Sequence, residues 1–312
     1  MYDNIDFSLR SSDIPGIDFL SETPCYFEVT GEHDFKGQRV ISGNLDGFRI
    51  SVNRAGVNIK DGSLCKYYLG DNFQTLGRGD VKMAIEKLSD ALHLPINEAT
   101  ISRLDIAQNF IVKHPAPVYY NHLGELKYSK RAMCADSSLY YYQNNGVLIF
   151  YDKVREQRDK GRPIPELYQD SHTLRYERRY RRRLPAAFNV GRVTGALLYD
   201  ERFYIQVVDQ WKGAYKAIKK TNDITLNFDY MRTKRDLYTI GLLSLADQYG
   251  GELGLITQVN EAQKQGYLSK KQAFDMRQAI TDACKVKEGL TMQNEAILEL
   301  NKKVDEAAKF YR

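Results

Sequence analysis

The stretch Thr173–Leu184, TLRYERRYRRRL, decides how this chain is interpreted. Its tyrosines and its flanking Thr and Leu favour a β-strand, in which alternate residues point to the same face. That face carries one carboxylate among guanidinium groups, from Arg175, Glu177, Arg179 and Arg181. Guanidinium groups bind phosphate well, and a single carboxylate among them could coordinate a metal ion that itself binds phosphate.

A second segment has the same pattern. The residues 102–110, SRLDIAQNF, place Arg103 and Asp105 on one side of a strand and apolar residues on the other. Two strands of the form Arg-x-acid indicate a shared functional face. Two plainer interpretations stay open: a structural ion pair between Arg103 and Asp105, and an RNA-binding or merely solvated edge for the arginine-rich run.

The third informative segment is 147–157, VLIFYDKVREQ. An apolar strand ends at Tyr151, and Lys153 and Glu156 follow on what the pattern predicts to be the first turn of a helix. A phenol, a nearby lysine and acids on neighbouring strands are the groups needed to attack a phosphodiester, with tyrosine as nucleophile and a metal ion as Lewis acid.

Composition predicts a soluble globular protein with an anionic partner. With 312 residues, 43% of them hydrophobic and 27% charged, the chain is long enough for one large domain and a smaller one. The net charge of +5 leans weakly towards an anionic partner, and the 22 tyrosines supply stacking surfaces for bases.

The cysteines and the amino terminus exclude several classes of protein. The four cysteines are far apart and form no CxxC or Cys/His pattern, so we expect neither a zinc site nor a disulfide framework. The amino terminus lacks the order of a signal peptide, and no apolar run approaches the length of a membrane span. We therefore expect a cytoplasmic protein.

The order of elements predicts an α+β fold. Up to about residue 75, short apolar runs alternate with Gly, Asn and Asp turns, which predicts an antiparallel meander that includes LCKYYLGDN at 64–72. A helix at 79–94 and strands up to 183 follow, and five amphipathic helices come after Pro185. We expect an antiparallel-sheet catalytic domain in 1–190 and a helical domain, for DNA or partner binding, in 191–312.

Three segments, in this order, resemble the motifs of rolling-circle replication initiators, in particular those of the filamentous-phage gene II type: ATISRLDIAQNF, VLIFYDKVREQ and TLRYERRYRRRL. The upstream GSLCKYYLGDNFQTL resembles another element of that group, and the likeness covers roughly residues 40–190. In this family a tyrosine nicks one DNA strand and stays joined to the 5′ phosphate. The free 3′ hydroxyl primes synthesis, and the displaced strand is later resealed as a circle.

The resemblance implies a role for each candidate residue. Tyr151 falls on the nucleophile, and Lys153 on the charge partner of the attacked phosphate. Asp105 and Glu177 fall on divalent-metal ligands, with Glu156 as a possible third. Flanking phosphates would be held by arginines, from Arg103, Arg175, Arg179 and Arg181. Because the chain has no His-hydrophobic-His pair, carboxylates would hold the ion, which favours Mg²⁺ or Mn²⁺.

The expected partners are single-stranded or hairpin origin DNA, a host helicase and a DNA polymerase. Two alternatives remain: a noncatalytic module that binds origin DNA or RNA, and a relaxase of plasmid mobilisation. The run Tyr140–Tyr142 leaves open whether a second tyrosine takes part. In a hairpin strand at most Tyr140 and Tyr142 point the same way, and core or stacking roles are expected for them.

Overall fold

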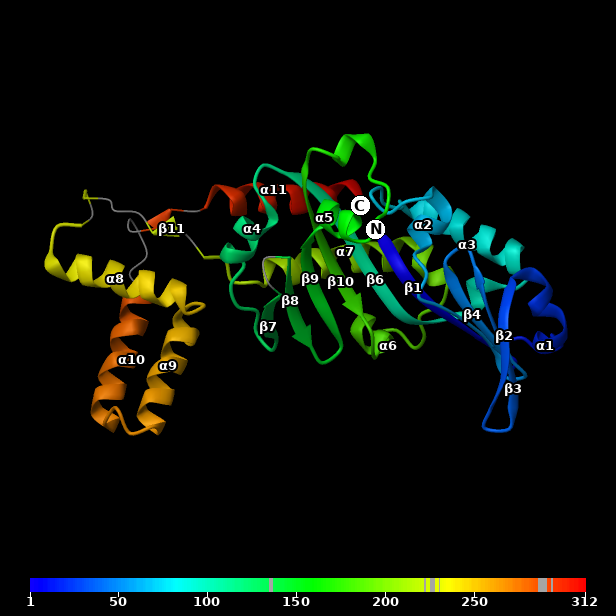
Figure 1. Ribbon diagram of the computed structural model, residues 1–312, viewed down its shortest axis with the longest axis horizontal. Coiled ribbons are helices and arrows are strands. Elements are labelled where there is room, and N and C mark those ends of the chain that lie inside the picture. Colours follow the sequence, from blue (N-terminus) through cyan, green and yellow to red (C-terminus); the bar gives the residue numbers. More distant parts are fainter. Residues whose placement is uncertain (135–136, 222, 225–227, 230, 286–290, 293) are drawn as a thin grey trace.

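Ten strands form one antiparallel sheet in the order β2-β3-β4-β5-β1-β6-β10-β9-β8-β7 (Figure 1). The computed structural model describes residues 1–134, 137–221, 223–224, 228–229, 231–285, 291–292 and 294–312. The strands are β1 (Tyr2–Arg10), β2 (Glu28–Phe35), β3 (Gln38–Leu45), β4 (Phe48–Asn53), β5 (Gly56–Lys60), β6 (Thr100–Val112), β7 (Lys130–Cys134), β8 (Ser138–Gln143), β9 (Gly146–Asp152) and β10 (His172–Tyr180).

Helices flank this sheet and follow it, so the predicted α+β class is confirmed. They are α1 (Phe19–Glu22), α2 (Leu64–Leu69), α3 (Arg78–Leu92), α4 (Ala116–His122), α5 (Lys153–Asp159), α6 (Leu184–Phe188), α7 (Glu201–Lys216), α8 (Lys234–Gln248), α9 (Glu252–Lys264), α10 (Lys270–Lys285) and α11 (Glu295–Phe310). A separate strand pair joins β11 (Asp223–Ile224) to β12 (Thr291–Met292).

One face of the sheet is covered by α7, and the alternation within β10 explains why. Leu174, Tyr176 and Tyr180 are buried, and the Tyr176 ring stacks between Phe150 of β9 and Trp211 of α7, with centroid separations of 4.6 and 5.1 Å. Burial of these rings fixes which face is apolar. Arg175, Glu177 and Arg179 therefore point to the opposite face, where α5 lies (Figure 1). Arg178 stays on the α7 side, where it donates to the Gln210 carbonyl at 2.9 Å.

Strand β1 runs between β5 and β6, in the middle of the sheet. The sequence prediction missed it. Its signal is present, since Ile5, Phe7 and Leu9 alternate and are buried. Because β1 pairs with β6, it brings Asp3 beside the charged face of β6 and β10.

The prediction of a strand at 64–72 is wrong. Residues Leu64–Leu69 form α2, whose first turn is capped by the Ser63 hydroxyl, which accepts a hydrogen bond from the Lys66 amide at 3.2 Å. Gly70 ends the helix with a φ of 86°, a conformation that glycine adopts readily. A short apolar run fits strand and helix equally well, and here the capping residue decides.

The carboxyl-terminal helices fall into two groups. Helices α7 and α11 share the hydrophobic core of the sheet. Helices α8, α9 and α10 form a helical module around residues that include Ala246, Leu255 and Ile280, and Figure 1 shows it to one side of the sheet. The division into domains at residue 190 stays a prediction. No helix among the described residues is long and apolar enough to cross a membrane.

Trp211→Ala tests whether α7 holds the covered face of the sheet. Trp211 is fully buried, and its carbonyl accepts a hydrogen bond from the Tyr176 hydroxyl at 3.1 Å. We expect the free energy of unfolding to fall by about 3–5 kcal/mol, measured by urea denaturation. Leu253→Ala, at a position 58% exposed on α9, is the control and should change it by less than about 0.5 kcal/mol. Equal effects would contradict this packing.

A candidate active site on the charged face of the sheet

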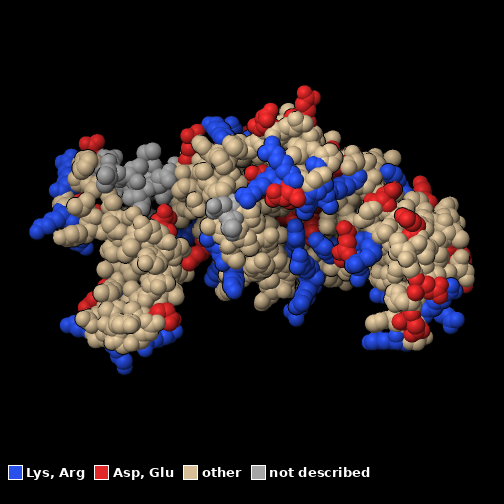
Figure 2. All heavy atoms as spheres, viewed as in Figure 1, with Lys and Arg blue, Asp and Glu red and all other residues tan. Residues whose placement is uncertain are grey.

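The three sequence motifs meet on one face, because β6, β10 and β9 are neighbours in register. Arg179 is paired with Asp105 on β6, and Arg175 with Tyr151 on β9. Directly paired residues project to the same side of an antiparallel sheet. Figure 2 shows basic and acidic side chains gathered over the middle of the sheet.

Glu177 is the centre of this group. Its Oε1 accepts hydrogen bonds from the Tyr151 hydroxyl and from Arg175 Nε, both at 2.7 Å, and its Oε2 accepts one from Arg179 Nε at 2.8 Å. Burial alone would raise the pKa of Glu177, yet Arg175 and Arg179 bring that pKa to about 2. The carboxylate is therefore ionised throughout the physiological range.

The Arg175 side chain is fully engaged inside the protein. It is 1% exposed, and Nη1 donates to the Asn72 carbonyl and to Asn109 Oδ1, each at 3.0 Å. Nη2 pairs with the carboxylate of Asp3. A buried guanidinium with these partners holds Glu177 in place. A phosphate contact by Arg175, as the sequence predicts, would require some of these bonds to break.

Asp105 is the second buried acid. Arg103 donates to it from Nε at 3.1 Å and from Nη2 at 2.5 Å, so the plainer interpretation of an ion pair between Arg103 and Asp105 describes a contact that is present. Burial raises the pKa of Asp105 to about 6, although Arg103 and Arg179 oppose that rise. The carboxyl group therefore titrates close to neutrality.

Arg179 lies between the two acids. Its Nη2 is 2.6 Å from Glu177 Oε2, and its Nε is 3.7 Å from Asp105 Oδ2. The side chain is 25% exposed. Of the predicted phosphate-binding arginines, Arg179 thus combines a place in the acidic cluster with access to solvent. Arg181 lies beyond the end of β10 and is exposed.

Glu156 lies outside the contacts of Asp105 and Glu177 and pairs with two lysines, Lys153 on α5 and Lys160 just after it. The helix starts at Asp152, whose Oδ1 accepts a hydrogen bond from the Arg155 amide at 2.9 Å. Lys153, 1% exposed, donates to Glu156 Oε2 at 2.9 Å, and Lys160 pairs with the same carboxylate. Burial, aided by Arg175, lowers the pKa of Lys153 to about 8. Lys153 therefore still carries most of its charge at neutral pH.

The predicted metal ligands do not form a ready metal site. Across the ranges that the structure describes, no group of three or more His, Cys, Asp and Glu side chains is placed to hold a metal ion. The oxygens of Asp105 and Glu177 accept from arginines, and those of Glu156 from lysines. Arg179 takes the position between Asp105 and Glu177, so an ion bound by both would require this guanidinium to leave.

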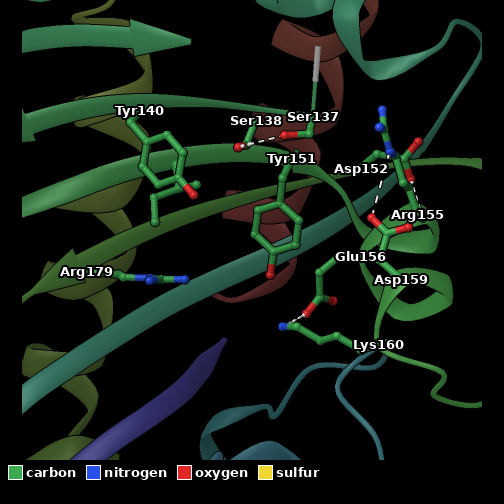
Figure 3. Close-up of a pocket in the computed structure, with 11 residues that line it drawn as sticks. Ser137, Ser138, Tyr140, Tyr151, Asp152, Arg155, Glu156, Asp159, Lys160 and Arg179 are labelled. Carbon is green, nitrogen blue, oxygen red and sulfur yellow. Dashed lines mark hydrogen bonds and ion pairs between the residues drawn. The ribbon is translucent and has the colours of Figure 1, made fainter. Parts of the chain in front are cut away.

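Two cavities meet at Tyr151. One, of about 490 Å³, is lined by acids and by cations that include Asp3, Asp105, Glu177, Lys66, Lys160 and Arg162. The other, of about 270 Å³, lies between β8, β9 and α5. In Figure 3, Tyr140 and Arg179 stand on one side of it, Glu156 and Lys160 on the other, and Tyr151 between them. A ligand that extends from one cavity into the other would contact Tyr151, which lines both.

Sequence reasoning missed several residues of the site. Asp3 lies on the unpredicted strand β1, where the period-two pattern was the available signal. Arg175 donates to the backbone carbonyl of Asn72 and to the side-chain oxygen of Asn109. Both asparagines lie within the motif segments, but neither was a candidate site residue, because a neutral side chain carries no signal of charge. Lys66 and Arg162 line the larger cavity from α2 and from the segment after α5. Their position depends on pairing between distant segments, which no local pattern reports.

The raised pKa of Tyr151 is the feature of this site that least favours deprotonation of the phenol. Burial, together with the neighbouring Glu177, raises that pKa well above 10, and Arg175 opposes the rise. At neutral pH the group is a phenol whose hydroxyl donates a hydrogen bond to Glu177. This oxygen could therefore act as a nucleophile only with loss of its proton.

Comparison with known proteins gives one match. A family model that describes the N-terminal region of the gene II type of replication-associated protein matches residues 33–214, more than half of the chain. The matched region contains β6, β9 and β10 with all of the predicted site residues. No curated protein matches the chain.

Arg175→Met tests the structural role of this arginine. The substitution leaves Glu177 and Asp3 buried without their guanidinium partner, so we expect the free energy of unfolding to fall by about 3–5 kcal/mol in the absence of DNA. Urea denaturation measures it. The exposed Arg181 supplies the control, since Arg181→Met should change the value by less than about 0.5 kcal/mol. If both variants were equally stable, the internal contacts of Arg175 would not contribute to stability.

Asp105→Asn tests the raised pKa. Folded protein with a carboxyl pKa of about 6 keeps a proton that the unfolded chain releases near pH 4. The stability contributed by that proton is present at low pH and is lost as the pH rises through about 6. The stability of wild type relative to the variant should therefore fall by about 2 kcal/mol between about pH 4 and pH 7. A constant difference in urea denaturation would refute it.

Proposed function

Because the chain belongs to the family of replication-associated proteins of the filamentous-phage gene II type, we propose that it initiates rolling-circle replication by nicking and rejoining one DNA strand. The observation that carries the proposal is the hydrogen-bonded group of the partly buried Tyr151 and the buried Glu177 and Arg175, which lies where two polar cavities meet. A tyrosine held in this way is oriented for attack on a phosphate in either cavity.

The proposed reaction is a transesterification. The Tyr151 hydroxyl oxygen attacks the scissile phosphorus, the phosphate bond to the 3′ oxygen breaks, and that oxygen takes up a proton. The phenol proton is released, and the strand stays attached to Tyr151 through its 5′ phosphate. Because this ester retains the energy of the broken bond, a 3′ hydroxyl can reverse the step and rejoin the strand without ATP.

Cations around the phenol can stabilise the negative charge that develops on the phosphate during attack. Arg179 lines both cavities and is partly exposed, and Lys153 lies at the start of α5 beside the larger one. Lys66 and Arg162 line the larger cavity as well. Fixed cations in a partly closed site stabilise charge on the non-bridging oxygens more strongly than water does. We assign the flanking phosphates to these side chains.

A noncatalytic DNA-binding role is the second candidate, and one observation favours it. The Tyr151 hydroxyl is satisfied by Glu177, as in many structural tyrosines, and its pKa is raised. A binder would use the cations that line the two cavities, with the tyrosine only as structural support. Host helicase and polymerase partners remain part of the proposal that the protein initiates replication.

Tyr151→Phe separates these two functions. Wild-type protein with Mn²⁺ and end-labelled single-stranded origin DNA should form a covalent adduct, located on Tyr151 by peptide mass spectrometry, and the variant should form none. Tyr140→Phe, in the same cavity, is the matched control and should keep the adduct. An adduct that persists in Tyr151→Phe would show that another residue is the nucleophile. Binding of DNA without cleavage by either protein would favour the noncatalytic DNA-binding role. Loss of the adduct with EDTA tests the predicted dependence on Mg²⁺ or Mn²⁺.

A further inference from the structure

Two tyrosines of β8 form a pair of parallel rings on the charged face of the sheet. The rings of Tyr140 and Tyr142 are stacked, with centroids 5.5 Å apart and planes 4° from parallel. Tyr141, between them, is fully buried on the other face, where its hydroxyl donates to the Leu123 carbonyl at 2.8 Å. The alternation of the strand therefore separates a core tyrosine from two that face the site.

Tyr142 is the open end of this pair. It is 46% exposed, whereas Tyr140 is half-buried and lines the same cavity as Tyr151 (Figure 3). A purely structural pair would gain most from covering both rings. Here the outer ring keeps much of its surface in water, although it belongs to a strand that is paired on both sides, with β7 and with β9.

Cations lie on both sides of Tyr142 in the same row of the sheet. On β7 the paired residue is Lys130, which is exposed, and on β9 it is Val147, which pairs in turn with Arg179 on β10. Neighbouring strands are about 5 Å apart, and Tyr142 and Arg179 lie two strands apart in the same row of the sheet. Their Cα atoms are therefore separated by roughly 10 Å. One short segment of a DNA strand can reach both residues.

We propose that Tyr142, supported from behind by Tyr140, is a stacking platform for an unpaired base of single-stranded DNA next to the Tyr151 site. Aromatic rings interleaved with cations bind single strands in this way, with bases on the rings and phosphates on the cations. The proposal rests on the proposed function for its substrate class, and it does not depend on cleavage.

The test is a binding measurement in the Tyr151→Phe background, so that no strand is cut. A fluorescein-labelled oligothymidylate serves as probe, because stacking tolerates any base. Tyr142→Leu should weaken binding about 10-fold, since it removes one base-aromatic contact. Tyr142→Phe and Tyr142→Trp keep a ring and should bind within about 2-fold of the parent protein or more tightly. Phe35→Leu, at a position 60% exposed on β2 near the opposite edge of the sheet, is the matched control and should leave affinity unchanged.

A scan with abasic nucleotides locates the stacked base. An abasic site at that position should weaken binding by the parent protein and have no further effect on Tyr142→Leu. DNA binding that is equal for the parent, Tyr142→Leu and Tyr142→Trp would overturn the platform alone, and adduct formation by Tyr151 would then still support the nickase. Absence of DNA binding by every variant would overturn the platform and the proposed substrate together.

Discussion

The buried ion pair between Arg175 and Glu177 is the constraint on which the rest of this structure depends. Removing two charges from water is costly, and the cost is offset only when every donor and acceptor finds a partner. Asp3 from β1, the Asn72 carbonyl after α2 and Asn109 from β6 supply those partners for Arg175. Distant parts of the chain are therefore held together by the same contacts that position the phenol of Tyr151.

One face of the sheet is apolar and the other is charged, and β10 contributes residues to both. Its tyrosines pack on α7, while Arg175, Glu177 and Arg179 build the charged face. Because the period of a strand is two, a change in the packing of Tyr176 also shifts its neighbours Arg175 and Glu177. Stability of the core and geometry of the candidate site are thus linked along a single strand.

Local patterns predicted what lies within one element. The alternation in β10 and β6, and the helix start after Tyr151, were readable because each depends on residues close in sequence. Asp3 was missed, since its place follows from pairing between β1 and β6 across about a hundred residues. The burial of Arg175 could not be predicted from the sequence either, because an arginine-rich run is ordinarily exposed to solvent. The helix at Leu64–Leu69 depended on the Ser63 cap, which a hydrophobic pattern does not report.

The helical module of α8 to α10 enters the chain between α7 and α11, and both of these helices belong to the core of the sheet. In the language of protein architecture the module is an insertion tethered at both ends, rather than an appended tail. Its sequence can diverge, or be exchanged for another, while both core helices keep their places. Changes in the surface of the module can therefore accumulate without altering the contacts that hold the charged face of the sheet.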